Sequence, residues 1–155
     1  MRATYRAAAH VVALSPGMRD GVIAAGVRPD RVTLIPNASD LELFSPHVDP
    51  GDLRARLGLE GAFVASYFGT MGEANDLGQV VEAAALLQGR GERSVAFVLQ
   101  GDGKRRRGLE ADIEGRGLDN VQLLPAGDKH SAARLAAASD AVSYTHLTLP
   151  TICSV

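Results

Sequence analysis

The chain has 155 residues, of which 46% are hydrophobic and 22% charged, and its formal net charge is −2. This profile is typical of a globular domain and excludes a strongly basic surface for nucleic acid. No apolar run approaches the roughly 20 residues of a membrane-spanning helix, and no signal peptide is evident. The only cysteine is Cys153, which excludes a disulfide framework and a cysteine metal cluster, so we expect a cytoplasmic setting.

The first part of the chain alternates short helical and strand patterns. We predict helices over residues 2–8 and 16–25 and strands over residues 10–14 and 32–35. Ser15 followed by Pro16 has the order of a helix N-cap and the first helical residue. Residues 37–50 are rich in residues that break helices and strands, which predicts a crossover linker, and a brief helix follows over residues 52–57.

The next part of the chain alternates apolar strands with helices. We predict strands over residues 62–68, 95–99 and 121–124, and a further strand beginning at 140. Helices are predicted over residues 76–88, 104–115 and 131–138. Strands that are continuously apolar are buried on both faces, so we predict an α/β fold with a Rossmann-like parallel sheet. Right-handed crossovers then bring every strand-to-helix loop to one carboxyl edge.

Two glycine-bearing loops are predicted at that edge, over residues 69–76 and 101–104. Glycines let an anionic ligand approach backbone N–H groups, and a following helix N-terminus favours negative charge. Ordinary turn chemistry explains the same glycines, and neither loop matches the dinucleotide or P-loop motifs. Lys104 opens the predicted helix, where its ammonium would meet phosphate oxygens. We interpret the rest of the basic run, residues 105–107, as a solvated helix face.

The composition changes abruptly at the C-terminal end. The segment VSYTHLTLPTICSV, residues 142–155, contains no Asp, Glu, Lys or Arg. Residues 142–151 are also what a widely used transposase sequencing adaptor encodes in one reading frame. We therefore interpret residues 142–155 as a non-native tail, the alternative being a genuine strand and turn, since Val, Tyr and Thr favour strands. No function is assigned to Tyr144, His146 or Cys153.

Four segments carry a combined pattern: FVASYFGTMGEANDLGQVVEAAALL, FVLQGDGKRRRGLE, GLDNVQLLPAGDKHSAARLAAASDA, and the signature Ile35-Pro36-Asn37, Asp40, Phe44 and Pro46. Together they resemble the retaining glycosyltransferases of family 4, which have the two-lobed GT-B fold. The resemblance implies that residues 1–36 end an acceptor lobe, residues 37–50 link the lobes, and residues 51–141 form part of a donor lobe. On this interpretation the chain is a piece of a longer enzyme, truncated at both ends.

The resemblance also implies an activity, namely transfer of a sugar from a nucleotide diphosphate sugar to a glycan or lipid-linked acceptor. The NDL form of the first donor-lobe loop favours bacterial surface-polysaccharide synthesis, in the cytoplasm or peripherally at the inner face of the membrane. No metal or other cofactor is implied, and the sequence holds no Asp-x-Asp motif. The implied roles are contact with the diphosphate, with the nucleotide and, through backbone groups, with the base. The resemblance places Gly69, Thr70 and Gly72 against the diphosphate, with Asn75 nearby. It places Gly101, Asp102 and Gly103 on the nucleotide side and implies backbone contacts from Leu124 and Pro125 to the base. Lys104 completes this set of predicted donor-binding residues.

The sequence departs from the family pattern at two places. The first donor-lobe loop reads Gly72-Glu73-Ala74-Asn75 where many members carry a basic pair, and the Glu-x7-Glu motif is absent. That motif would lie beyond Ala141, so we expect residues 48–141 to bind a nucleoside diphosphate only weakly and to transfer no sugar alone. A non-catalytic nucleotide-binding Rossmann module is the first alternative. An α/β epimerase or hydrolase is the second, although Tyr67 lacks the lysine of a Tyr-x-x-x-Lys dyad.

Overall fold

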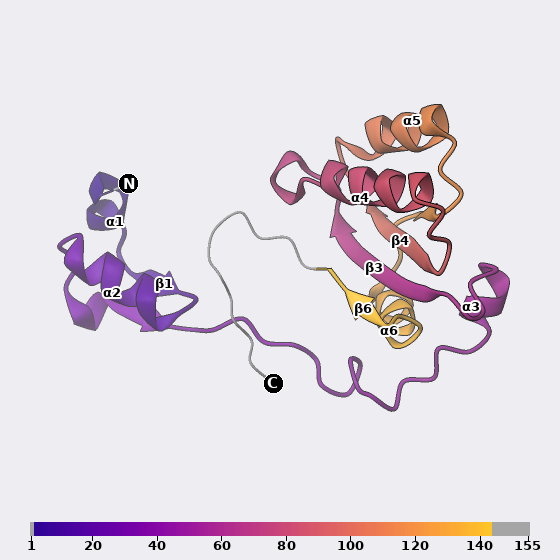
Figure 1. Cartoon of the computed structure of the whole chain (residues 1–155). Coiled ribbons are helices and arrows are strands. Elements are labelled where there is room, and N and C mark those ends of the chain that lie inside the picture. The colour runs from indigo at the N-terminus through magenta and orange to yellow at the C-terminus, as the bar shows by residue number, and fades with distance from the viewer. Residues whose placement is uncertain (1, 144–155) are drawn as a thin grey trace. The chain divides into compact units, whose positions relative to one another are not determined.

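The computed structural model describes residues 2–143, and this part of the chain separates at Asp40 into two compact units. Both units are built from parallel strands and covering helices, as Figure 1 shows. Among the described residues, no helix is both long enough and apolar enough to cross a membrane.

The first unit is a two-stranded parallel sheet with short helices. Strands β1 (Val11–Ala13) and β2 (Val32–Leu34) pair, with Val11 opposite Val32. Its helices are α1 (Arg2–Ala7), α2 (Pro16–Ala24) and the 3₁₀ turn η1 (Pro29–Arg31). The Ser15 hydroxyl accepts a hydrogen bond from the Met18 N–H at 3.2 Å, and Pro16 is the first residue of α2. The predicted N-cap is therefore confirmed.

The second unit is a four-stranded parallel sheet in the order β5-β4-β3-β6. Its strands are β3 (Phe63–Thr70), β4 (Val95–Asp102), β5 (Val121–Leu124) and β6 (Ala141–Val142). Its helices are α3 (Leu53–Arg56), the 3₁₀ turn η2 (Glu73–Asn75), α4 (Gly78–Gly89), α5 (Arg106–Arg116) and α6 (Lys129–Ala137). The predicted α/β fold with a parallel sheet is confirmed.

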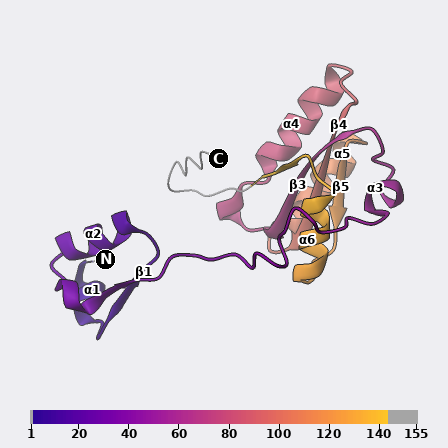
Figure 2. The same cartoon turned by 90° about the horizontal axis from the view of Figure 1, so that it is seen from below.

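Helices cover both faces of this sheet, as the two views in Figures 1 and 2 show. On one face, α4 and α5 bury Val81 and Leu109 against Tyr67 and Leu99 of the strands. On the other face, Leu135 of α6 packs with strand residues, and Leu53 of α3 and the following Leu57 lie at the edge of the same cluster. Strands buried on both faces need apolar residues at consecutive positions, which explains their unbroken apolar runs.

Predicted boundaries at the carboxyl edge of the sheet are wrong for two strands and for the helices that follow them. Strands β3 and β4 continue through Thr70 and Asp102, so the first glycine of each predicted loop lies within a strand. Helix α4 begins at Gly78 because Asp76 has a left-handed backbone, with φ at 42°, which interrupts the helix. Helix α5 begins at Arg106, so Lys104 precedes the helix instead of opening it.

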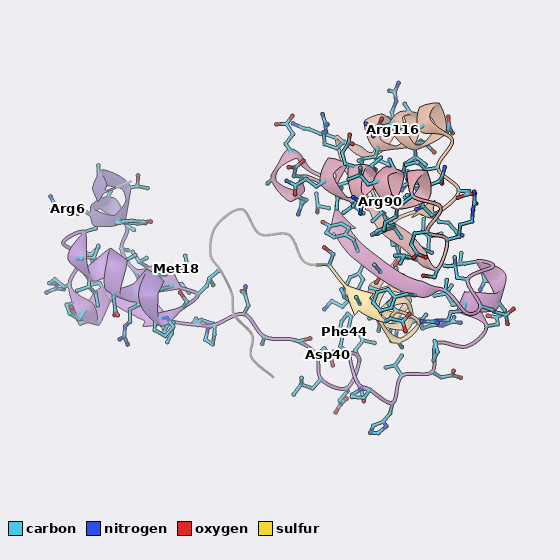
Figure 3. All side chains as sticks on the ribbon, in the orientation of Figure 1. Arg6, Met18, Asp40, Phe44, Arg90 and Arg116 are labelled. Atoms are coloured by element: carbon cyan, nitrogen blue, oxygen red, sulfur yellow. The ribbon has the colours of Figure 1, made fainter. Side chains whose placement is uncertain are left out.

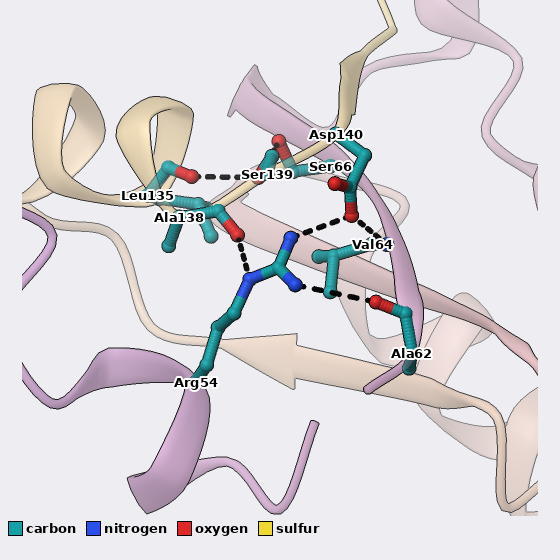
Figure 4. A network of polar contacts seen from close by, with 8 residues as sticks. All are labelled: Arg54, Ala62, Val64, Ser66, Leu135, Ala138, Ser139 and Asp140. Carbon is teal, nitrogen blue, oxygen red and sulfur yellow. Dashed lines mark hydrogen bonds and ion pairs between the residues drawn. The ribbon is translucent and has the colours of Figure 1, made fainter. Parts of the chain in front are cut away.

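An arginine joins α3 to the far end of the unit (Figure 4). Arg54 Nη2 lies 2.5 Å from the Asp140 carboxylate, and Arg54 Nε donates to the Ala138 carbonyl at 2.7 Å. The same carboxylate accepts a hydrogen bond from the Val64 N–H at 2.8 Å. Asp140 therefore holds β6 beside β3, where Val142 pairs with Ser66. From residue 144 onward, the predicted non-native tail lies outside the described residues.

Candidate functional site: a cavity at the carboxyl edge of the sheet

The ends of β3 and β4 meet at the same edge of the sheet. Gly69 pairs with Gly101 and Thr70 with Asp102, in parallel register. At the next strand, Leu124 ends β5 opposite Gln100. The prediction that both glycine segments share one carboxyl edge is therefore confirmed.

The glycines at this edge are required by the close approach of two backbones. Gly101 has φ at 155°, and a Cβ added there would lie 1.9 Å from the Gly69 carbonyl oxygen. Gly103 has φ at 152°, and its Cβ would lie 2.5 Å from the Met71 carbonyl oxygen. That carbonyl also accepts a hydrogen bond from the Arg105 N–H at 3.0 Å, which holds the turn before α5. The two glycines thus serve the sheet itself, whether or not a ligand is bound.

A cavity of about 360 Å³ opens beside these strand ends. Three segments line it, from the end of β3, the end of β4, and the loop and first turn of α6. Four of the predicted donor-binding residues are brought together there, namely Gly69, Thr70, Gly101 and Asp102. The other lining residues were not predicted from the sequence; they are Phe68, Gln100, Ala126, Gly127, Asp128, Lys129 and Ala132.

The loop before α6 is shaped by Asp128, whose carboxylate accepts a hydrogen bond from the Ser131 N–H at 2.8 Å. This hydrogen bond lowers the pKa of Asp128, so the carboxylate is charged at neutral pH. Gly127 lies close against the same helix, because a Cβ there would meet the Ser131 hydroxyl oxygen at 1.9 Å. An Asp N-cap after an apolar strand is the signal that would have found this loop in the sequence.

Gln100 lies on the wall of the cavity, below the loop. Its Nε2 is 3.3 Å from the Ser131 hydroxyl, and its buried Oε1 has no hydrogen-bond partner among the described residues. Neighbouring Arg106 donates from Nη1 to the carbonyls of Gly101 and Leu124, both at 2.7 Å. Arg106 therefore links the ends of β4 and β5 through hydrogen bonds. The prediction that residues 105–107 form a solvated helix face is wrong for this residue.

The remaining predicted residues lie outside this cavity. Gly72 lines a second cavity of about 200 Å³, and the Asn75 Oδ1 accepts a hydrogen bond from the Gly72 N–H at 3.4 Å. Leu124 and Pro125 line a third cavity of about 260 Å³, between α3 and α6. In the part of the chain that the structure describes, Gly103 and Lys104 line none of these three cavities.

The chemistry of the first cavity suits binding better than acid–base or nucleophilic catalysis. Its lining carries two carboxylates, Asp102 and Asp128, and one ammonium, Lys129, but no His, Cys or Tyr. The Asp102 Oδ1 accepts a hydrogen bond from the Gly103 N–H at 2.7 Å, so this amide already faces an anionic group. Among residues 2–143, no group of three or more His, Cys, Asp or Glu side chains is placed to hold a metal ion.

The fold matches that of GT-B glycosyltransferases. Two structures show this: Anabaena Alr3699/HepE in complex with UDP, at a TM-score of 0.73 and 26% identity, and WaaG, a glycosyltransferase involved in lipopolysaccharide biosynthesis, at a TM-score of 0.68 and 19% identity. They are matched over 94% and 84% of this chain, respectively.

Sequence comparisons point to the same class of protein. Residues 1–38 match the family described as Glycosyl transferase 4-like domain. The chain is 31% identical to WcaI of Escherichia coli (strain K12), assigned as a glycosyl transferase of colanic acid biosynthesis, over 90% of this chain. It spans 37% of the length of WcaI, 40% of HepE and 36% of WaaG. The chain is thus similar to parts of larger sugar transferases.

Proposed function

We propose that this chain supplies the donor-binding part of a nucleotide-sugar-dependent glycosyltransferase of the retaining family 4. Residues 1–36 would end the acceptor lobe, residues 37–50 would link the lobes, and residues 51–141 would belong to the donor lobe. The observation that carries the proposal is the cavity beside Gly69 and Gly101, whose strand ends meet in register at one edge. Ligands of open parallel sheets bind at this edge. The similarity to HepE, which is known in complex with UDP and with UDP-glucose, supports a nucleoside diphosphate as the ligand.

The proposed reaction breaks the bond between the anomeric carbon and the diphosphate and forms a bond from that carbon to an acceptor hydroxyl oxygen. The hydroxyl loses its proton, and the diphosphate leaves with the bonding electrons. Lys129 is the one cation in the lining, and we assign to its ammonium the stabilisation of the charge that develops on the diphosphate. The contribution of these residues is to bind and orient the donor.

The proposal includes the setting of the enzyme. The acceptor is a glycan or a lipid-linked sugar of a bacterial surface polysaccharide, and the similarity to WcaI supports that substrate class. The enzyme works in the cytoplasm, with peripheral contact to the inner face of the membrane where a lipid-linked acceptor is presented. This chain on its own binds the nucleoside diphosphate and transfers no sugar.

The chain has two lysines, which make a matched test. Both are exposed, but Lys129 lines the cavity and Lys104 lies outside it. We expect Lys129→Gln to weaken binding of UDP or GDP about three- to tenfold, the range of one partly exposed charge-assisted contact. Lys104→Gln should leave the affinity unchanged. Isothermal titration calorimetry with UDP, GDP and UDP-glucose measures both.

Three results would contradict the proposal. Absence of UDP and GDP binding at millimolar concentration would remove the nucleotide site. A loss of affinity in Lys104→Gln with none in Lys129→Gln would restore the role predicted for Lys104 and place the diphosphate elsewhere. Detectable sugar transfer from UDP-glucose by the chain alone would show that it holds a complete catalytic site.

A further inference from the structure

The segment that precedes α3 contacts the candidate donor cavity through an aromatic pair. Phe44, which lies on this segment in Figure 3, stacks on Phe68 with ring centroids 6.1 Å apart and an interplanar angle of 20°. Both residues belong to the second unit. This separation lies in the favourable range for paired aromatic rings.

Phe68 takes part in three sets of contacts. It lies near the end of β3, opposite Gln100 in the register of β4. Its side chain packs against the buried cluster that includes Val64 and Leu135, and it also lines the cavity. Phe44 therefore contacts the aromatic side chain that forms the apolar wall of the site.

Stacking on Phe44 orders the Phe68 side chain before a ligand binds. A side chain that is already ordered does not have to lose its rotamer freedom on binding. Phe44 is half-buried, and its ring stacks on Phe68, which restricts the rotamers open to Phe68. By thermodynamic reciprocity, a ligand that contacts Phe68 favours the state in which the segment around Phe44 is docked.

We propose that Phe44 is a positioning residue for the donor site, which acts by holding Phe68 in the cavity wall and so couples donor binding to docking of the segment before α3. The proposal rests on the proposed function, because the ligand it names is the nucleoside diphosphate of that site. It adds a residue outside the cavity lining and an observable response of this segment to donor binding.

The natural sequence contains no tryptophan, so Phe44→Trp creates a single fluorescent reporter. We expect its emission to shift on titration with UDP, at the same concentrations at which calorimetry reports binding. Phe63→Trp is the matched control, since Phe63 lies at the other end of β3, is 49% exposed and does not line the cavity. Its emission should not respond to UDP.

The affinity for UDP provides a second test of the positioning role of Phe44. Removal of one aromatic contact in Phe44→Ala should weaken UDP binding about two- to tenfold. Phe44→Tyr retains the ring and should restore the wild-type affinity, whereas Phe63→Ala should not change it. Phe44→Leu retains apolar bulk without a flat ring and serves where Phe44→Ala does not fold.

The outcomes separate this inference from the proposed function. If UDP binds while Phe44→Ala and Phe44→Leu keep the wild-type affinity, the positioning role is refuted and the nucleotide site stands. A Phe44→Trp signal that does not change at saturating UDP refutes the coupling in the same way. Failure of the wild-type chain to bind UDP and GDP refutes both.

Discussion

The close approach of β3 and β4 at Gly101 predicts that one methyl group added there strongly lowers the free energy of unfolding. In Gly101→Ala, the new Cβ would lie 1.9 Å from the Gly69 carbonyl oxygen. This oxygen belongs to the backbone of the neighbouring strand, so it cannot move away as the end of a flexible side chain could. Relief requires the strand ends to separate, with strain at φ 155° and the loss of a ladder hydrogen bond. Backbone strain, overpacking and one lost hydrogen bond together cost about 3–6 kcal/mol. That is a large share of the roughly 5–15 kcal/mol that stabilises a domain.

The matched control is Gly108→Ala, the same substitution in α5. No atom lies within 4 Å of a Cβ added at Gly108, and the residue is exposed. Because alanine favours helix over glycine, this variant should gain up to about 1 kcal/mol. Urea unfolding followed by circular dichroism gives the change in free energy for both, provided that the slopes agree. Equal midpoints for Gly101→Ala and the wild type would refute the view that strand packing requires this glycine.

Two further predictions follow from the same unit. The Val64 N–H and the Arg54 guanidinium hold the pKa of Asp140 below its usual value. The charged carboxylate therefore stabilises the folded chain at pH values above the unfolded pKa of about 3.9. This stabilisation is lost as the pH falls through the lower pKa of the folded chain. In urea unfolding, the wild type should therefore be more stable than Asp140→Asn at pH 7, and the difference should shrink toward pH 2; a constant difference would contradict this account. We also predict that donor binding needs no metal, so addition of EDTA should leave the calorimetric affinity for UDP unchanged, and a loss of affinity that Mg²⁺ restores would overturn this prediction.

The order of helices and strands was predictable because its signals are local. The continuous apolar runs of β3 and β4 indicated strands buried on both faces, and the parallel sheet followed from the helices between them. The shared edge of Gly69 and Gly101 followed in turn, because parallel strands have their carboxyl ends at the same edge of a sheet. The starts of α4 and α5 were not predictable, because they depend on the backbone conformation of Asp76 and on a hydrogen bond from Arg105 to Met71.

The composition of the cavity was only partly predictable. Gly69, Thr70, Gly101 and Asp102 follow directly from the strand ends, and the structure places all four in the lining. Lys129, by contrast, is 25 positions beyond Lys104 in the sequence, and only Lys104 was predicted as a candidate.

The sequence by itself determined the layered fold and the edge where its glycines meet, because both depend on the spacing of apolar residues along the chain. Only the tertiary structure brought Phe44 against Phe68, and Gln100 near Ser131. These contacts join side chains separated by 24 and 31 positions, so no local pattern encodes them. They exist because crossovers fold distant segments onto one end of a sheet, and the candidate donor cavity is formed by that convergence.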